Sequence, residues 1–171
     1  MSKRHFLMMA AYNRWANYRV YTAAEALSEE EWRRDTGVFF GSLMGTLNHI
    51  LVADRIWLHR FTREGAAPTA LDAILHPDLA SLRQAREKED ARIIEWIGAL
   101  SDAEIAGRFT YTTISDMRTI SQRLEPALAH LFNHQTHHRG QAHAALTRLG
   151  RPSIGLDLIA FLRTEDGRAF A

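Results

Sequence analysis

The sequence predicts one all-α domain, a four-helix bundle with short connecting helices and one small extended hairpin. Two observations predict this fold. Apolar residues recur with the period of a helix over four long segments. The pattern Ser-x-x-Glu, which caps the start of a helix, follows two of those segments, at residues 28–31 and 101–104. The length of 171 residues and the 46% hydrophobic content suit a single domain, residues 1–171, with a sizeable core.

The first two long helices are predicted on either side of a short one. The first begins after Ser2 and reaches Leu27, and the amides of Asn13 and Asn17 lie on or beside its apolar stripe. These amides are interpreted as polar core residues with hydrogen-bond partners, the alternative being that they face a pocket. The second long helix covers residues 42–61, and Asp54 lies within its apolar face, where a carboxylate needs a partner.

The second half repeats this outline. After a linker at residues 65–68, a third long helix starts at residues 76–78 and ends near residue 100. Residues 109–114 are rich in β-branched and aromatic side chains, which predicts an extended hairpin with residues 117–120. The last long helix begins between Ser121 and Pro126 and stops at Gly150, and a short helix follows in the tail.

Composition narrows the classes of function. The 21 Lys and Arg are interspersed with 20 Asp and Glu, so no basic stripe predicts binding to nucleic acid. The sequence has no cysteine, which leaves imidazole and carboxylate as the good metal ligands. No apolar stretch approaches the about 18 residues that span a membrane, so a cytoplasmic protein without a membrane partner is expected.

A cluster of histidines is the strongest chemical signal. Five of the nine histidines fall between His130 and His143. His134 and His138 are four residues apart, so on a helix both rings leave one face and can hold one metal ion. The residue after His134 is Gln135, so the HExxH motif of metalloproteases is absent.

A third ligand is predicted in the first half. Asn48-His49 there matches Asn133-His134 in the second half, and two related halves packed about a pseudo-two-fold axis would bring these histidines together. Small neighbours leave room for the His49 ring to reach across. The alternative is a histidine at the edge of the core, bonded to a backbone carbonyl.

Two further histidines have weaker claims. His137 lies about 100° from His138 around the helix, which favours a surface or supporting role over metal ligation. His130 lies one turn before His134 and could touch the metal or its substrate. Arg139 points away from the ligand face, and Asp54 is a candidate for its salt-bridge partner.

Three stretches of this sequence resemble the DinB family of damage-inducible proteins, and the resemblance covers nearly the whole chain. The most specific is NHxxHHRGQ at residues 133–141, supported by LNHIxxADxxW at 47–57 and YNxWANxR at 12–19. The resemblance implies a four-helix bundle, often homodimeric, with zinc or nickel held by three histidines. Carried over by position, these are His49, His134 and His138.

The resemblance leaves three classes of function open. A cation held by three neutral imidazoles acidifies a bound thiol or water. We expect a thiol S-transferase that uses a low-molecular-weight thiol, since the chain supplies no sulfur of its own. The alternatives are a metal-dependent hydrolase, with Asp54, Glu125 or Asp116 as the base, and a metal-binding stress-response protein without turnover.

Supporting residues and assembly are also predicted. Hydrogen bonds that orient the ligands are expected from a set including His130, Asn48, Asp54 and Gln141. The thiol would be recognised by loop residues at 63–77 or 110–121. A homodimer is expected from the family resemblance and from surplus aromatic surface, with exposed side chains at Trp15, Trp32 and Trp96.

Overall fold

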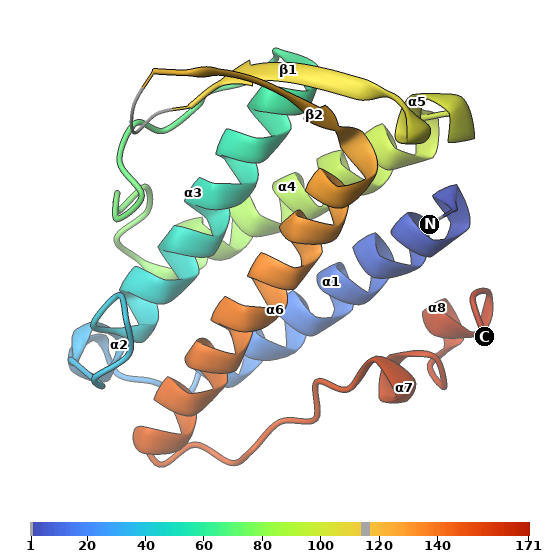
Figure 1. Cartoon of the computed structure of the whole chain (residues 1–171). Helices are drawn as coiled ribbons and strands as arrows, with labels where there is room; N and C mark the ends of the chain where they lie inside the picture. The colour runs from blue at the N-terminus through green and yellow to red at the C-terminus, as the bar shows by residue number, and fades with distance from the viewer. Residues whose placement is uncertain (1, 114–116) are drawn as a thin grey trace.

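The computed structural model describes residues 2–113 and 117–171. Each of the four long helices packs against two of the others, α1 and α3 both contacting α4 and α6 (Figure 1). The fold is therefore the predicted four-helix bundle. Its long helices are α1 (Lys3–Ala24), α3 (Leu43–Thr62), α4 (Leu79–Ala99) and α6 (Leu124–Arg148).

Side-chain caps start the helices where the sequence predicts them. Both predicted capping boxes form, and they start the short helices α2 (Glu29–Arg33) and α5 (Asp102–Ala106). Each cap gives a partner to backbone N–H groups that the first turn of a helix leaves free. The long helices α1, α3 and α4 have simpler caps, in which the side chain of Ser2, Ser42 or Asp78 accepts from one backbone N–H.

The predicted hairpin forms, with its second strand later in the chain than expected. Strands β1 (Arg108–Thr112) and β2 (Thr119–Arg123) pair antiparallel and cross one end of the bundle (Figure 1). Met117, expected in the second strand, has a φ of 54° and lies in the turn instead. Ile114, predicted in the first strand, and Asp116, one candidate for the base of a hydrolase, lie outside the described residues.

Between the four long helices, two apolar clusters lie on either side of a polar layer, and a third cluster joins α1 to the C-terminal tail. On α1, the residues of one cluster lie at positions 6–10 and those of the other at 20–24. Asn13 and Asn17, between them, are buried, as are Asp54 on α3, Arg86 on α4 and Arg139 on α6. Each long helix thus contributes polar side chains to the middle of the bundle.

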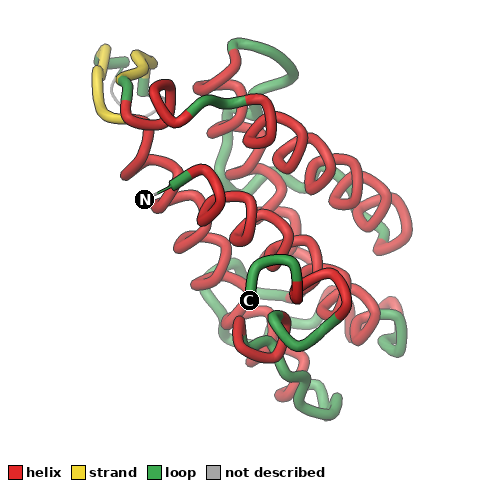
Figure 2. The backbone as a smooth tube through the Cα atoms, turned by 90° about the vertical axis from the view of Figure 1, so that its right-hand side faces the viewer, coloured by secondary structure: helices red, strands yellow, loops and turns green. Residues whose placement is uncertain are grey.

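The C-terminal tail covers one side of α1. Its two short helices, α7 (Leu158–Phe161) and α8 (Glu165–Arg168), lie beside α1 in both views (Figures 1 and 2). Phe161 is fully buried, with its ring centroid 6.0 Å from that of Tyr12. The apolar residues of the tail thus pack on the bundle, as predicted.

The expectation that all three tryptophans are exposed is wrong for Trp32. Trp32 is only 2% exposed, and its Nε1 donates to the Pro77 carbonyl at 3.1 Å. Trp15 and Trp96 are half-buried, and the Trp96 ring stacks on Phe61 at 5.0 Å. Trp32 thus packs against the linker between α3 and α4, and Trp96 packs against α3, so less aromatic surface is exposed than the sequence predicts.

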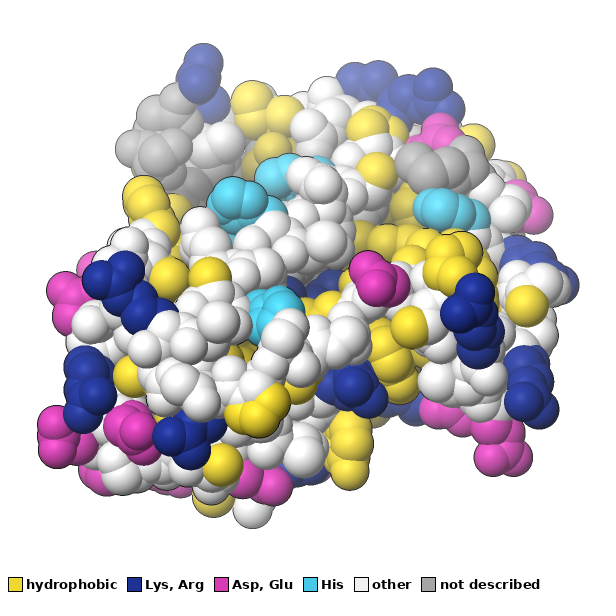
Figure 3. Space-filling view, turned by 90° about the horizontal axis from the view of Figure 1, so that it is seen from below, with side chains coloured by type: hydrophobic (Ala, Val, Ile, Leu, Met, Phe, Trp, Pro, Cys, Tyr) yellow, Lys and Arg dark blue, Asp and Glu magenta, His cyan; other side chains and the backbone are white. Residues whose placement is uncertain are grey.

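The surface carries charges of both signs. On the face drawn in Figure 3, basic and acidic side chains are interspersed. Within residues 2–113 and 117–171, no helix combines the length and the apolar character needed to cross a bilayer.

Candidate metal centre

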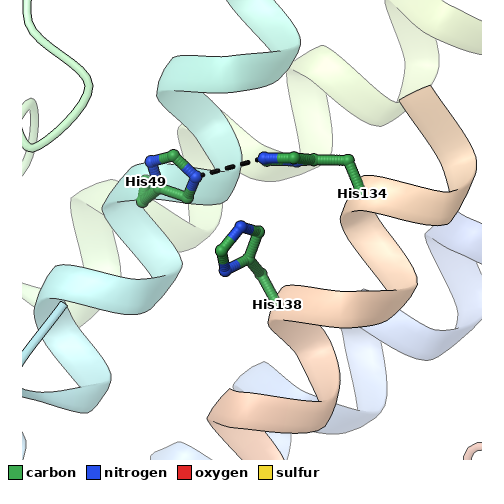
Figure 4. Close-up of side chains that lie close together, drawn as sticks. All are labelled: His49, His134 and His138. Atoms are coloured by element: carbon green, nitrogen blue, oxygen red, sulfur yellow. Dashed lines mark hydrogen bonds between the residues drawn. The ribbon is translucent and has the colours of Figure 1, made fainter. Parts of the chain in front are cut away.

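Three histidines from two helices meet beside the polar layer (Figure 4). His134 and His138 leave the same face of α6, and their ring centroids are 4.4 Å apart. His49 reaches them from α3, and its Nε2 lies 3.3 Å from Nε2 of His134. One ring nitrogen from each of the three lies within 4.8 Å of the other two. The structure therefore brings the three predicted ligands together.

Hydrogen bonds at Nδ1 of His49 and of His138 leave the Nε2 atoms of these two rings able to bind a cation. Nδ1 of His49 donates to the Leu71 carbonyl at 2.7 Å, and Nδ1 of His138 donates to Oε1 of Gln141 at 2.9 Å. Because a neutral imidazole carries one proton, each Nε2 then presents a lone pair. The predicted bond from His49 to a backbone carbonyl is therefore present, and the other ring nitrogen of His49 faces the cluster.

The spacing fits a tetrahedral divalent metal. Two nitrogens about 2.0–2.1 Å from a zinc ion lie about 3.3 Å apart in tetrahedral geometry. The Nε2 atoms of His49 and His134 have this separation, 3.3 Å. His134 Nδ1 is buried and has no hydrogen-bond partner among the described residues. No hydrogen bond at Nδ1 therefore fixes which nitrogen of this ring carries the proton. The donor set and its geometry therefore suit a metal bound through three imidazoles.

Electrostatics keep the three imidazoles neutral. Burial and the neighbouring rings of His138 and His49 lower the pKa of His134 to about 3. The pKa values of His49 and His138 are also lowered, mainly by burial. Because only neutral imidazole offers a lone pair, these shifts hold the cluster in the state that binds metal.

An aromatic wall holds His49 in place. Phe40, in the segment between α2 and α3, stacks on the His49 ring with centroids 3.8 Å apart and planes 19° from parallel. The same ring lies 5.6 Å from that of His138. The neighbouring Phe39 is 80% exposed, so the wall continues to the surface. Sequence reasoning missed Phe40, because nothing in its local pattern indicates a contact with α3.

Asn48 supports the site through the loop at residues 63–78. Its Nδ2 donates to the His76 carbonyl and its Oδ1 accepts from the His76 N–H, both at 3.0 Å. This pair ties the end of the loop to α3, and the loop carries the Leu71 carbonyl that binds His49. The predicted direct contact from Asn48 to a ligand ring is not seen. A backbone carbonyl takes that role, and no sequence signal marks it.

Asp54 belongs to the polar layer and is paired with Arg86, so the suggested pairing with Arg139 is wrong. Arg86 lies between Asp54 and Asp90, with its Nη2 3.1 Å from Asp90 Oδ1. The two oxygens of Asp54 also accept from Nε2 of Gln135 at 2.8 Å. Burial raises the pKa of Asp54 to about 7 despite the Arg86 charge.

Arg139 instead donates to amide oxygens of the polar layer. It bonds Asn13, and its Nη1 lies 3.3 Å from Oδ1 of Asn17 and 3.2 Å from Oε1 of Gln135. Gln135 and Arg139 directly follow His134 and His138 in sequence. Their buried contacts therefore fix the rotation of α6 that turns both histidines toward α3, a role that sequence reasoning missed.

The other histidines of α6 lie outside the cluster. His137 is exposed, as predicted, and its Nε2 lies 3.2 Å from Nε2 of Gln141, whose Oε1 binds His138. His130 is exposed too, with its ring centroid 5.7 Å from that of His134 and 5.1 Å from that of Trp57. It therefore flanks the site, and its ring packs on aromatic neighbours.

Glu125 is remote from the cluster. It lies in the first turn of α6, where its Oε2 binds Nη2 of Arg123 at 3.0 Å. Nine residues separate it from His134, or about 13 Å along the helix. With Asp54 enclosed by Arg86 and Gln135, neither described candidate for a general base faces the three histidines.

Comparisons with known proteins agree with this fold. The chain is 25% identical to Protein DinB of Bacillus subtilis (strain 168) over 163 residues, which cover 88% of this chain and 90% of that protein. The crystal structure of a DinB-like protein from Bacillus cereus superposes with a TM-score of 0.69 at 18% identity, covering 88% of this chain and 94% of that one. The DinB family model matches residues 1–168. The chain therefore belongs to the DinB family.

Proposed function

We propose that this protein binds a divalent metal ion through His49, His134 and His138 and uses it to transfer a low-molecular-weight thiol to an electrophile. The observation that carries the proposal is the convergence of three neutral imidazole nitrogens within 4.8 Å. Nitrogen-rich sites suit zinc and nickel, which are the proposed metals. A cation with three neutral ligands keeps its positive charge and lowers the pKa of a thiol bound beside it.

In the proposed reaction the thiol sulfur forms a bond to an electrophilic carbon. The thiol proton passes to solvent, and the leaving group departs with the electron pair of the broken bond. The sulfur must come from outside, because the sequence contains no cysteine. The protein itself holds the three imidazoles neutral, orients two of them through Leu71 and Gln141, and lines the cluster with Phe40.

The placement of the carboxylates favours thiol transfer over hydrolysis. A metal-dependent hydrolase usually has a general base near the bound water. Asp54 is 1% exposed and bonded to Gln135, and Glu125 lies near the start of α6. A thiol needs less help, because its pKa is already much closer to neutrality than that of water.

The deciding experiment uses zinc- and nickel-loaded protein with glutathione, bacillithiol or mycothiol and monochlorobimane as electrophile. We expect metal-dependent conjugation with one of these thiols and none in His134→Ala. His137→Ala is the matched control, because it removes an exposed histidine from the same helix. Hydrolysis of activated esters without conjugation would favour the hydrolase. Inactivity in both assays with metal retained would favour a non-catalytic metal-binding protein.

We also propose a homodimer, now supported by the family relationship alone. Light scattering of the purified protein at micromolar concentration tests it. A dimer mass would support this assembly, and a monomer mass would contradict it.

A further inference from the structure

The side chains beside the three histidines continue along α3 and α6 as a strip of four residues: Trp57, Arg60, Tyr111 and His130. Arg60 lies eleven residues after His49 on α3, which returns it to nearly the same face, about 16 Å further along the axis. Side chains on a helix lean toward its N-terminus, so the Arg60 guanidinium leans back toward His49.

Two aromatic rings hold the Arg60 guanidinium. Its Cζ lies 4.7 Å from the centroid of Trp57 and 4.6 Å from that of Tyr111, which comes from the hairpin. Cation–π contacts of this kind restrict the arginine side chain without neutralising its charge. Among residues 2–113 and 117–171, no carboxylate forms an ion pair with Arg60. A half-buried cation is therefore available to a ligand.

The strip leads to the accessible side of the histidine cluster. His49 and His138 are buried, whereas His134 is half-buried and His130 next to it is exposed. The Trp57 ring contacts that of His130 at a centroid distance of 5.1 Å. The Arg60 guanidinium lies on the same Trp57 ring, 4.7 Å from its centroid, so Arg60 and His130 share one aromatic neighbour.

We infer that Arg60 binds a carboxylate of the thiol substrate while the sulfur lies at the three histidines. This inference rests on the proposed function and specifies its substrate as an acidic thiol. A guanidinium presents two parallel N–H donors that match a carboxylate. The guanidinium lies on the ring of Trp57. Trp57 is eight residues after His49, which is about 12 Å along the axis of α3. The carboxylate must therefore be several bonds from the sulfur.

Binding to cobalt-substituted protein tests this inference without relying on turnover. The probes are 6-mercaptohexanoate and 6-mercaptohexanol, which differ only in the terminal group, and the readout is the sulfur-to-cobalt absorption band. We expect the acid to bind about tenfold more tightly than the alcohol, as a charge-assisted contact predicts. 3-Mercaptopropionate, whose chain is too short to reach Arg60, should lack this advantage.

Arg60→Gln should remove the preference for the acid and leave binding of the alcohol unchanged. Arg34→Gln is the matched control, because it also removes one positive charge but from an exposed pair with Glu30 on the short helix α2. Equal affinity for the acid and the alcohol would overturn the inference about Arg60 but leave the proposed function standing. A preference for the acid that survives Arg60→Gln would do the same. Failure of every thiol to perturb the cobalt spectrum would overturn the proposed function as well.

Discussion

The Nε2 atoms of His49 and His134 lie 3.3 Å apart, although 85 residues separate the two histidines in the chain. His49 Nε2 presents a lone pair because its Nδ1 donates to the Leu71 carbonyl at 2.7 Å. Without metal, His134 must therefore offer a proton in this contact, since two facing lone pairs would repel. A bound cation would replace that proton and bind both nitrogens.

Three single substitutions, His49→Ala, His134→Ala and His138→Ala, should each remove most of the bound metal. Each change deletes one of three donors, and a cation with two imidazoles is held far more weakly. Elemental analysis of protein loaded with zinc or nickel and then desalted measures the content. His130→Ala and His137→Ala should retain metal, and a loss confined to these two variants would show that the ligand assignment is wrong.

Gln141→Ala should weaken metal binding by about 10- to 100-fold, because it removes the acceptor that orients His138. Competition with a chromophoric chelator gives the affinity. Asn133→Ala is the control, since this exposed amide precedes a ligand on the same helix without contacting the cluster. Equal affinities for the two variants would mean that Gln141 does not position the ring.

Arg86→Met should destabilise the protein by about 3–5 kcal/mol, because it leaves Asp54 and Asp90 buried without their shared cation. The free energy of unfolding in urea measures the effect. Arg34→Met removes an exposed pair and should cost about 0–1 kcal/mol. Similar losses in both variants would contradict a structural role for the polar layer.

The stability of the metal-free protein should depend on His134 in a pH-dependent way. The folded pKa of about 3 lies below the usual unfolded value of about 6.5. Between these values the unfolded chain binds more protons, so stability falls as the pH falls. Relative to His134→Ala, wild-type protein in chelator should therefore lose stability from pH 6.5 toward pH 3. A difference in urea midpoint between wild-type protein and His134→Ala that stays constant with pH would contradict this.

The sequence by itself determined the helices and the ligand face of α6. Caps at Ser28 and Ser101 act on backbone groups within one turn, so their effect can be read locally. The spacing of His134 and His138 likewise places both rings on one face through helix geometry alone. His49 was found by a different signal, the Asn-His pair that both halves of the chain share.

Tertiary structure decided which distant groups meet. Arg86 and not Arg139 pairs with Asp54, Trp32 is enclosed rather than exposed, and the Leu71 carbonyl binds His49. None of these contacts follows from a local period, because each depends on how the helices rotate against one another and where a loop crosses them. Burial then sets the charge states, lowering the pKa of His134 and raising that of Asp54, because desolvation acts only once the helices have packed.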